Sequence, residues 1–168
     1  VHVEHSYTEG FMTHNVSSRR RFKTLLKLGY SFFDRVVCVS NGQANWMASS
    51  RLMHTEKLST IQSCVDLTAF RALPAPTGPT RVFGAIGRLD ESKGLDTLIK
   101  AFRQCTDPDI QLHIIGEGAQ GPRLKSLAGT DKRIFFKGFL SDPVIAMADI
   151  DVVLMPSRWE SYGLVAIE

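Results

Sequence analysis

One stretch of the chain predicts a strand, a glycine-rich loop and a helix in succession: Arg81-Val-Phe-Gly-Ala-Ile-Gly-Arg-Leu-Asp-Glu-Ser-Lys-Gly-Leu-Asp-Thr-Leu-Ile-Lys-Ala-Phe102. Residues 81–86 are mainly apolar, as in a buried strand, and residues 87–94 form the loop. The apolar residues that follow recur at positions i, i+3, i+4 and i+7 and share one helix face: Leu95, Leu98, Ile99 and Phe102. The stretch therefore predicts one strand–loop–helix unit of an α/β fold.

The same alternation continues toward the end of the chain. Further strands are predicted at 110–115, 133–136 and 151–155, and helices around 124–127 and at 143–148. Strands that alternate with helices are joined by right-handed crossovers, which give a parallel sheet. We therefore expect an α/β fold of Rossmann-like type, with a parallel sheet covered by helices on both faces.

The first part of the chain predicts a second set of such elements. Strands are expected at 1–5 (a short buried strand), 35–39 and 57–61, and helices at 17–34 and 41–53, the latter capped by Ser40. Residues 73–79, Leu-Pro-Ala-Pro-Thr-Gly-Pro, predict a linker, because proline fits neither a ladder nor a helix interior. The predicted domains are 1–72, the linker 73–79, and 80–168. Since the first residue is Val1 in a strand and the last is Glu168 in a helical pattern, we expect truncation at both ends.

Composition excludes several classes of protein. Hydrophobic residues make up 43% of the chain and charged residues 22%, which is ordinary for a soluble globular protein. A net charge of +3 is too low for a dedicated nucleic-acid-binding protein. The three cysteines show no spacing typical of a disulfide framework or a zinc site. No apolar run reaches the roughly 20 residues of a membrane span, and no secretory signal is visible, so a cytoplasmic location is expected.

The loop 87–94 is the first candidate site, because ligands bind at the carboxyl ends of parallel strands. Its glycines allow the backbone to approach a ligand closely. Arg88 is a planar fork that can bind two phosphate oxygens, and Lys93 is a movable positive charge. Together they could neutralise most of a diphosphate. A solvated loop that leads into a helix is the alternative.

The second candidate site is Met155-Pro-Ser-Arg-Trp-Glu-Ser-Tyr-Gly-Leu-Val-Ala-Ile-Glu168. A strand, a proline turn and a helix that begins near Gly163 give an N-terminus suited to an anion. Glu160 precedes this helix, and Glu168 lies about five residues inside it, more than one turn. A carboxylate there could accept two vicinal hydroxyls of a ribose, although a surface glutamate is the alternative.

Taken together, these motifs resemble family four of the retaining glycosyltransferases, which have the GT-B fold. The resemblance rests on Gly87-Arg-Leu-Asp-Glu-Ser-Lys-Gly94, on Ile114-Ile-Gly-Glu-Gly118, on Phe136-Lys-Gly138 and on 156–168, where Glu160 and Glu168 reproduce a pair of glutamates. Residues 34–40, 57–66 and Phe70 look like the end of the family's N-terminal domain. The resemblance covers nearly the whole chain but only about half of a complete enzyme.

The resemblance implies a role for individual residues. Arg88 and Lys93 match the positions that grip the donor diphosphate, Glu168 the carboxylate on the ribose, and Glu160 the one that faces the transferred sugar. The other implied substrate contacts are the backbone of Tyr162, Gly163 and Leu164, the glycines Gly87, Gly116 and Gly138, Phe139 beside the nucleobase, and His5 at the donor sugar. For His5 a satisfied buried histidine is an alternative, and His2 or Glu4 could face the cleft instead. Tyr162 stands where many relatives carry phenylalanine.

The implied reaction is sugar transfer, without a metal or other cofactor, from a UDP- or GDP-linked donor to a glycan or lipid-linked acceptor. Configuration is retained, and surface polysaccharide synthesis is the expected setting. A GT-B nucleotide-sugar epimerase and a non-catalytic nucleotide-sugar-binding module are the alternatives. The fragment alone is expected to be inactive. The basic run Arg19-Arg-Arg21 could bind an anionic membrane at its inner face, or could simply be a solvated helix end.

Overall fold

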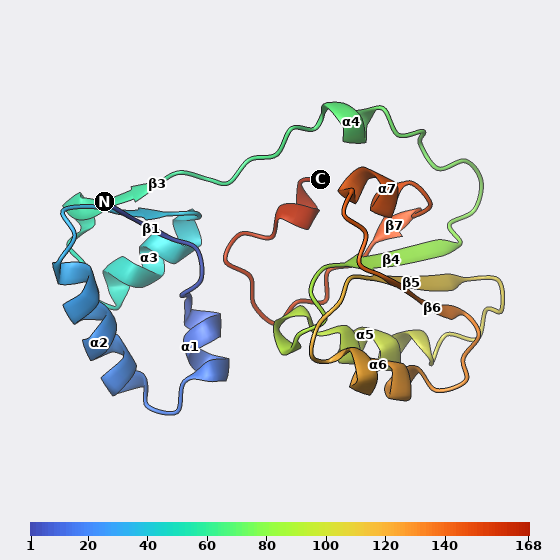
Figure 1. Cartoon of the computed structure of the whole chain (residues 1–168), viewed down its shortest axis with the longest axis horizontal. Coiled ribbons are helices and arrows are strands. Elements are labelled where there is room, and N and C mark those ends of the chain that lie inside the picture. Colours follow the sequence, from blue (N-terminus) through green and yellow to red (C-terminus); the bar gives the residue numbers. More distant parts are fainter. The chain divides into compact units, whose positions relative to one another are not determined.

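The computed structural model describes residues 1–168 (Figure 1). The chain forms two compact units, which are described separately. The first contains Val1–Val65 together with Trp159–Ile167, and the second contains Asp66–Arg158 together with Glu168. The segment 73–79 carries no helix or strand.

The second unit is built on a parallel sheet of four strands: β4 (Val82–Ile86), β5 (Gln111–Ile115), β6 (Ile134–Gly138) and β7 (Val152–Val153). The strand order is β6-β5-β4-β7, and every neighbouring pair is parallel. The chain therefore moves outward from β4 to β6 and then returns to the other side of β4, so the strand order reverses beside β4. The expected parallel α/β sheet is confirmed.

The helices of this unit are α4 (Thr68–Arg71), α5 (Leu95–Phe102), α6 (Gly121–Ala128) and α7 (Pro143–Met147), with a 3-10 turn at Glu91–Lys93. The apolar face predicted for α5 is confirmed, since its buried residues pack in one core with the middle of β4 and β5 and with α6: Ala85, Leu89, Leu95, Ile99, Phe102, Leu112, Ile114, Leu124 and Ala128. The other face of the sheet is covered only in part, because α7 has five residues and leaves Phe135 and Val152 exposed.

The first unit has a three-stranded parallel sheet in the order β1 (His2–Glu4), β2 (Val36–Cys38), β3 (Leu58–Thr60). Its helices are α1 (Glu9–Asn15), α2 (Arg19–Ser31) and α3 (Asn41–Ser49), with 3-10 turns at Thr55–Lys57 and Leu164–Ala166. Helix α1 was not expected from the sequence; the Thr8 hydroxyl caps it by accepting from Phe11 N at 3.2 Å. The predicted cap of α3 is confirmed, because Ser40 Oγ accepts from Gln43 N at 3.2 Å.

Three local predictions are wrong. The first strand is not buried as a whole, because Val1 and Val3 are exposed and only Glu4 is fully inside. Helix α3 ends at Ser49 rather than Met53, since Arg51 has a left-handed φ of 53° and Leu52 N turns back to Met47 O. Glu168 does not lie inside a helix. Only the 3-10 turn Leu164–Ala166 follows Gly163, because the backbone bonds here span three residues rather than four: Ala166 N donates to Gly163 O at 3.0 Å and Ile167 N to Leu164 O at 2.9 Å.

Candidate functional site

The sequence-predicted phosphate loop lies where the sheet order reverses. It follows β4, whose neighbours β5 and β7 lie on opposite sides. In open parallel sheets a ligand crevice forms outside the carboxyl ends of the strands at such a reversal. The topology of the second unit therefore places Gly87–Gly94 at the position where this fold binds ligands.

The sheet's backbone pairing continues from the ends of β5 and β6 into the loops that follow β4 and β5. Gly87 N donates to Ile115 O at 3.0 Å, Leu89 N to Glu117 O at 2.8 Å, and Gly116 N to Gly138 O at 2.7 Å. We call these segments, residues 87–89, 115–118 and 138, the loop ladder. It holds three of the predicted substrate-binding glycines side by side, which the sequence could not show.

Glycine is required at the closest crossing of the loop ladder. Gly116 has a φ of 130°, and a Cβ placed on it would lie 1.9 Å from Gly87 O. A Cβ on Gly118 would lie 2.5 Å from Leu89 O. Real Cβ atoms do not approach a carbonyl oxygen this closely, so a side chain at either position would push the loops apart.

Arg88 and Lys93 lie on the same loop. The Arg88 guanidinium is 82% exposed and its Nη2 lies 3.3 Å from Asp90 Oδ2. The Lys93 side chain runs over Gly87, with its Cε 3.3 Å from the position that a Cβ of Gly87 would occupy. Exposed ion pairs such as Arg88–Asp90 contribute only about 0 to 1 kcal/mol, so the guanidinium can exchange this partner for a phosphate at little cost.

Side-chain hydrogen bonds fix the shape of this loop. Asp90 Oδ1 accepts from Ser92 N at 3.0 Å and also from the Ser92 hydroxyl. Gly94 has a left-handed φ of 63°, and a Cβ there would lie 2.1 Å from Pro156 O. The segment that follows β7 therefore packs directly on the end of the loop.

Arg158 ties these two segments together, and sequence reasoning missed it. Its guanidinium donates to Asp96 Oδ1 at 2.8 Å, Asp96 Oδ2 at 2.9 Å and Glu91 O at 2.6 Å, while its backbone N donates to Ser92 O at 2.7 Å. Burial raises the pKa of Asp96, but the hydrogen bonds and charge of Arg158 outweigh it and hold the pKa below its ordinary value. Arg158 therefore stabilises the shape of the loop and is not proposed as a ligand contact.

A cavity of about 250 Å³ opens beside Arg88. Its walls combine apolar side chains with the loop ladder: Ile86, Gly87, Arg88, Ile115, Gly116, Glu117, Phe139 and Leu140. A second cavity, of about 480 Å³, shares Gly116 and Glu117 with it and extends to Gly138, Lys125 and Phe136. Apolar and aromatic walls next to a guanidinium suit a planar ring joined to a phosphate.

Four of the predicted residues, Glu160 and Tyr162–Leu164, belong to the first unit. Trp159, just before them, stacks on His14 of α1 with ring centroids 4.6 Å apart and planes 12° apart. A Cβ on Gly10 would lie 2.4 Å from Trp159 Cβ, so α1 needs glycine at this contact. Ser161 Oγ donates to Ser6 O at 3.4 Å. The convergence of Glu160 and Glu168 with Arg88 and Lys93 on one ligand stays a prediction.

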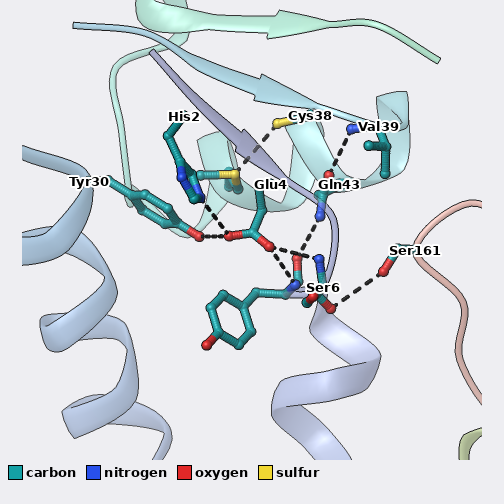
Figure 2. Close-up of polar contacts among 10 residues, drawn as sticks. His2, Glu4, Ser6, Tyr30, Cys38, Val39, Gln43 and Ser161 are labelled. Atoms are coloured by element: carbon teal, nitrogen blue, oxygen red, sulfur yellow. Dashed lines mark hydrogen bonds and ion pairs between the residues drawn. The ribbon is translucent and has the colours of Figure 1, made fainter. Parts of the chain in front are cut away.

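His5 is exposed and follows β1 directly, so the alternative of a buried histidine is wrong. The other two residues considered for this role are engaged within the first unit (Figure 2). His2 stacks on Phe33 with ring centroids 4.9 Å apart, and its Nε2 lies 3.5 Å from Glu4 Oε2. Glu4 is 4% exposed and accepts a hydrogen bond from Tyr30 Oη at 2.6 Å. His5 is thus the most exposed of the three.

Burial raises the pKa of Glu4, yet the pKa lies below its ordinary value of 4.5. The reason is that hydrogen bonds from the Tyr30 hydroxyl and from the backbone of Tyr7 and Ser6 outweigh the cost of burial. Glu4 is therefore an ionised carboxylate inside the first unit. No group of three or more His, Cys, Asp or Glu side chains is arranged to hold a metal ion. None of the helices is both long and apolar enough to cross a membrane.

The comparisons with known proteins agree with this architecture. Residues 68–168 match the family described as "Glycosyl transferases group 1". The O-antigen biosynthesis glycosyltransferase WclY of Escherichia coli is 33% identical over 88 residues, which are 51% of this chain and 24% of that protein. The 2-deoxystreptamine glucosyltransferase of Streptomyces kanamyceticus is 34% identical over 103 residues, which are 57% of this chain and 26% of that protein.

Solved glycosyltransferase structures share the fold. HepE of Anabaena, solved in complex with UDP and glucose, superimposes with a TM-score of 0.72 at 22% identity, over 92% of this chain and 46% of that one. The expected Rossmann-like GT-B fragment is confirmed at the level of fold. The chain spans about a quarter of the length of the two curated relatives.

Proposed function

The chain belongs to the glycosyl transferases group 1 family, and we propose that the complete protein moves a sugar from a UDP- or GDP-linked donor to a glycan or lipid-linked acceptor. Surface polysaccharide synthesis is the proposed setting, which the name of the E. coli relative supports, and the cytoplasmic face of a membrane is the proposed location. The observation that carries the proposal is that Arg88 lies in the loop ladder and lines an apolar cavity, while the Lys93 side chain of the same loop runs over Gly87.

The proposed chemistry follows from these charges. As the bond between the sugar C1 and the diphosphate oxygen breaks, negative charge develops on the leaving group. Arg88 and Lys93 stabilise that charge, so that the reaction proceeds without a metal ion. The acceptor hydroxyl attacks C1 from the side of the departing diphosphate and gives up its proton to a diphosphate oxygen. Because the new bond forms on the same face as the bond that breaks, the configuration of the sugar is retained.

Each remaining residue has a proposed place on the donor. The nucleobase packs in the cavity lined by Phe139, next to Gly138 and Gly116. Glu168 accepts the ribose hydroxyls. The transferred sugar is contacted by His5 and Glu160 and by the backbone of residues 162–164.

Donor binding by the complete protein tests this proposal. Arg88→Ala and Lys93→Ala should each weaken binding of UDP- or GDP-sugars in calorimetric titrations. Lys100→Ala, which removes an exposed cation from α5 of the same unit, is the matched control and should bind as the wild type does. Sugar transfer is followed with a radiolabelled donor, and NMR of the product separates retention from inversion and transfer from donor epimerisation. If no UDP- or GDP-sugar binds and no sugar is transferred, the proposal is wrong.

Helix α2 favours peripheral contact with an anionic membrane as part of this function. Three exposed apolar residues, Leu25, Leu28 and Phe32, follow Arg21 at helical spacing and so lie on the same side of the helix. The exposed cations Arg19 and Arg20 lie at the same end as Arg21. Apolar and basic side chains on one helix are typical of helices that lie in the lipid interface, and each cation adds about 1 kcal/mol near anionic lipid.

Vesicle sedimentation of the complete protein tests this contact. Replacing Arg19, Arg20 and Arg21 by glutamine should abolish binding to vesicles that contain phosphatidylserine, and the wild type should not bind neutral phosphatidylcholine vesicles. Equal sedimentation of the wild type and the triple variant would end the idea.

A further inference from the structure

Two buried polar side chains of the first unit have no part in the proposed reaction. Glu4 at the end of β1 is 4% exposed, and Gln43 in α3 is 2% exposed. Burying a charged or amide group is costly unless it is fully hydrogen-bonded. Their partners show what each of them holds (Figure 2).

Glu4 holds the backbone of the turn that follows β1. Its Oε1 accepts from Ser6 N at 2.7 Å and from Tyr7 N at 3.0 Å. Its Oε2 accepts from Tyr30 Oη at 2.6 Å, which anchors the carboxylate to α2. Oε1 therefore binds the turn, and Oε2 binds helix α2.

Gln43 holds the same turn from the opposite side. Its Nε2 donates to Tyr7 O at 3.1 Å, while its Oε1 accepts from Val39 N at 3.0 Å, at the end of β2. Tyr7 is thus held at both its backbone N–H and its carbonyl. The turn is tied to α2 through Glu4 and to the neighbouring strand through Gln43.

His5 lies in the chain between Glu4 and the clamped residues Ser6 and Tyr7, with its own side chain exposed. Its chain neighbours are Glu4, whose carboxylate accepts the hydrogen bonds of the clamp, and Ser6, whose backbone N–H donates one of them. We infer that Glu4 and Gln43 are positioning residues that fix the His5 imidazole at the carboxyl end of β1 for its contact with the donor sugar. This inference rests on the proposed role of His5. Positioning matters because a displacement of about 1 Å can cost about 100-fold in rate.

A double-mutant cycle in the complete protein tests the clamp. Glu4→Ala should lower kcat for sugar transfer by about 10- to 100-fold, close to the effect of His5→Ala. In the His5→Ala background Glu4→Ala should change kcat by less than about twofold, because nothing remains to be positioned. A merely structural Glu4 would instead lower kcat by the same factor in both backgrounds, and that result would overturn the inference.

Tyr30→Phe is the matched control. It removes the bond to Oε2 and lowers thermal stability, yet it leaves the Ser6 and Tyr7 contacts of Oε1 in place, so kcat should stay within about twofold of the wild type. Glu4→Gln keeps an oxygen toward the turn and should restore most of the activity lost in Glu4→Ala. If Glu4→Ala does not fold, Gln43→Met, which removes the other arm of the clamp at similar volume, enters the same cycle.

A second readout separates this inference from the proposed function. The ¹H–¹³C NMR signal of the His5 ring should shift or broaden in Glu4→Ala but not in Tyr30→Phe. If that pattern appears while no sugar is transferred, the clamp stands and the proposed function fails. An unchanged His5 signal in Glu4→Ala would overturn the clamp whatever the activity.

Discussion

Replacing Gly116 by alanine is expected to break the loop ladder. The new Cβ would lie 1.9 Å from Gly87 O, so this oxygen has to move by about 1.1 Å to reach even the 3.0 Å limit of real Cβ contacts. Such overpacking against backbone costs about 1 to 3 kcal/mol. The movement also strains the hydrogen bond from Gly87 N to Ile115 O or that from Gly116 N to Gly138 O, which is worth about 1 kcal/mol.

Gly129→Ala is the matched control, because it separates steric contact from backbone strain. Gly129 also has a positive φ, 62°, but a Cβ there would meet nothing within 4 Å. Both variants carry a strain cost of about 1 to 3 kcal/mol. The free energy of unfolding of Gly116→Ala should therefore be about 2 to 4 kcal/mol lower than that of Gly129→Ala. For a chain of this size this corresponds to a difference of roughly 4 to 16 °C in Tm.

The assay is thermal unfolding followed by circular dichroism, together with calorimetric titration of UDP and GDP into the complete protein. Gly116→Ala should also weaken nucleotide binding, because Gly87 and Arg88 move with the displaced oxygen, whereas Gly129→Ala should bind normally. Equal Tm values for the two variants, with equal nucleotide affinity, would show that the crossing of these loops does not shape the site.

Three further outcomes are expected. Arg88→Ala should raise the Kd for the donor about 10- to 150-fold in calorimetric titrations, since one charge-assisted hydrogen bond is worth about 1.5 to 3 kcal/mol; an unchanged Kd would remove Arg88 from the site. Because the pKa of Glu4 is lowered on folding, the stability that its carboxylate contributes is fully present above pH 4.5 and is lost as the pH falls through the folded-state pKa. In urea unfolding, the free energy of unfolding of Glu4→Gln should therefore fall less with acid than that of the wild type. Asp142→Ala should destabilise the second unit by about 1 kcal/mol in urea unfolding, because Asp142 Oδ1 accepts from Val144 N at 2.8 Å and caps α7; a change within error would mean that water replaces this cap.

Local sequence patterns predicted much of the fold. The spacing of Leu95, Ile99 and Phe102 fixed both the presence of α5 and its buried face, and Ser40 correctly marked the start of α3. Helix α2 shows the limit of this reasoning. Leu25, Leu28 and Phe32 have helical spacing but lie on the exposed side, and Tyr30 is the buried residue. Periodicity identifies a helix, whereas the face that is buried depends on the neighbours it meets.

The same distinction applies to the candidate site: the sequence identified some of its residues, and only the structure showed the roles of others. Arg88 and Lys93 could be chosen from the sequence, because glycine-rich loops after strands expose cations that suit phosphate. Arg158 and Glu4 could not be assigned their roles, since Arg158 meets Asp96 across 62 positions of the chain and Glu4 meets Tyr30 across 26. No local signal marks which charged side chain will be buried against a distant partner.

By itself, the sequence determined the alternation of strands and helices, the glycine-rich loop and the charges it carries, because these depend on neighbours within a turn or two of the chain. Only the tertiary structure decided that Gly87, Gly116 and Gly138 lie side by side and that Glu4 is an ionised, buried clamp. Strand order and the partners of buried polar groups depend on contacts between distant segments, and such contacts exist only after the chain has folded.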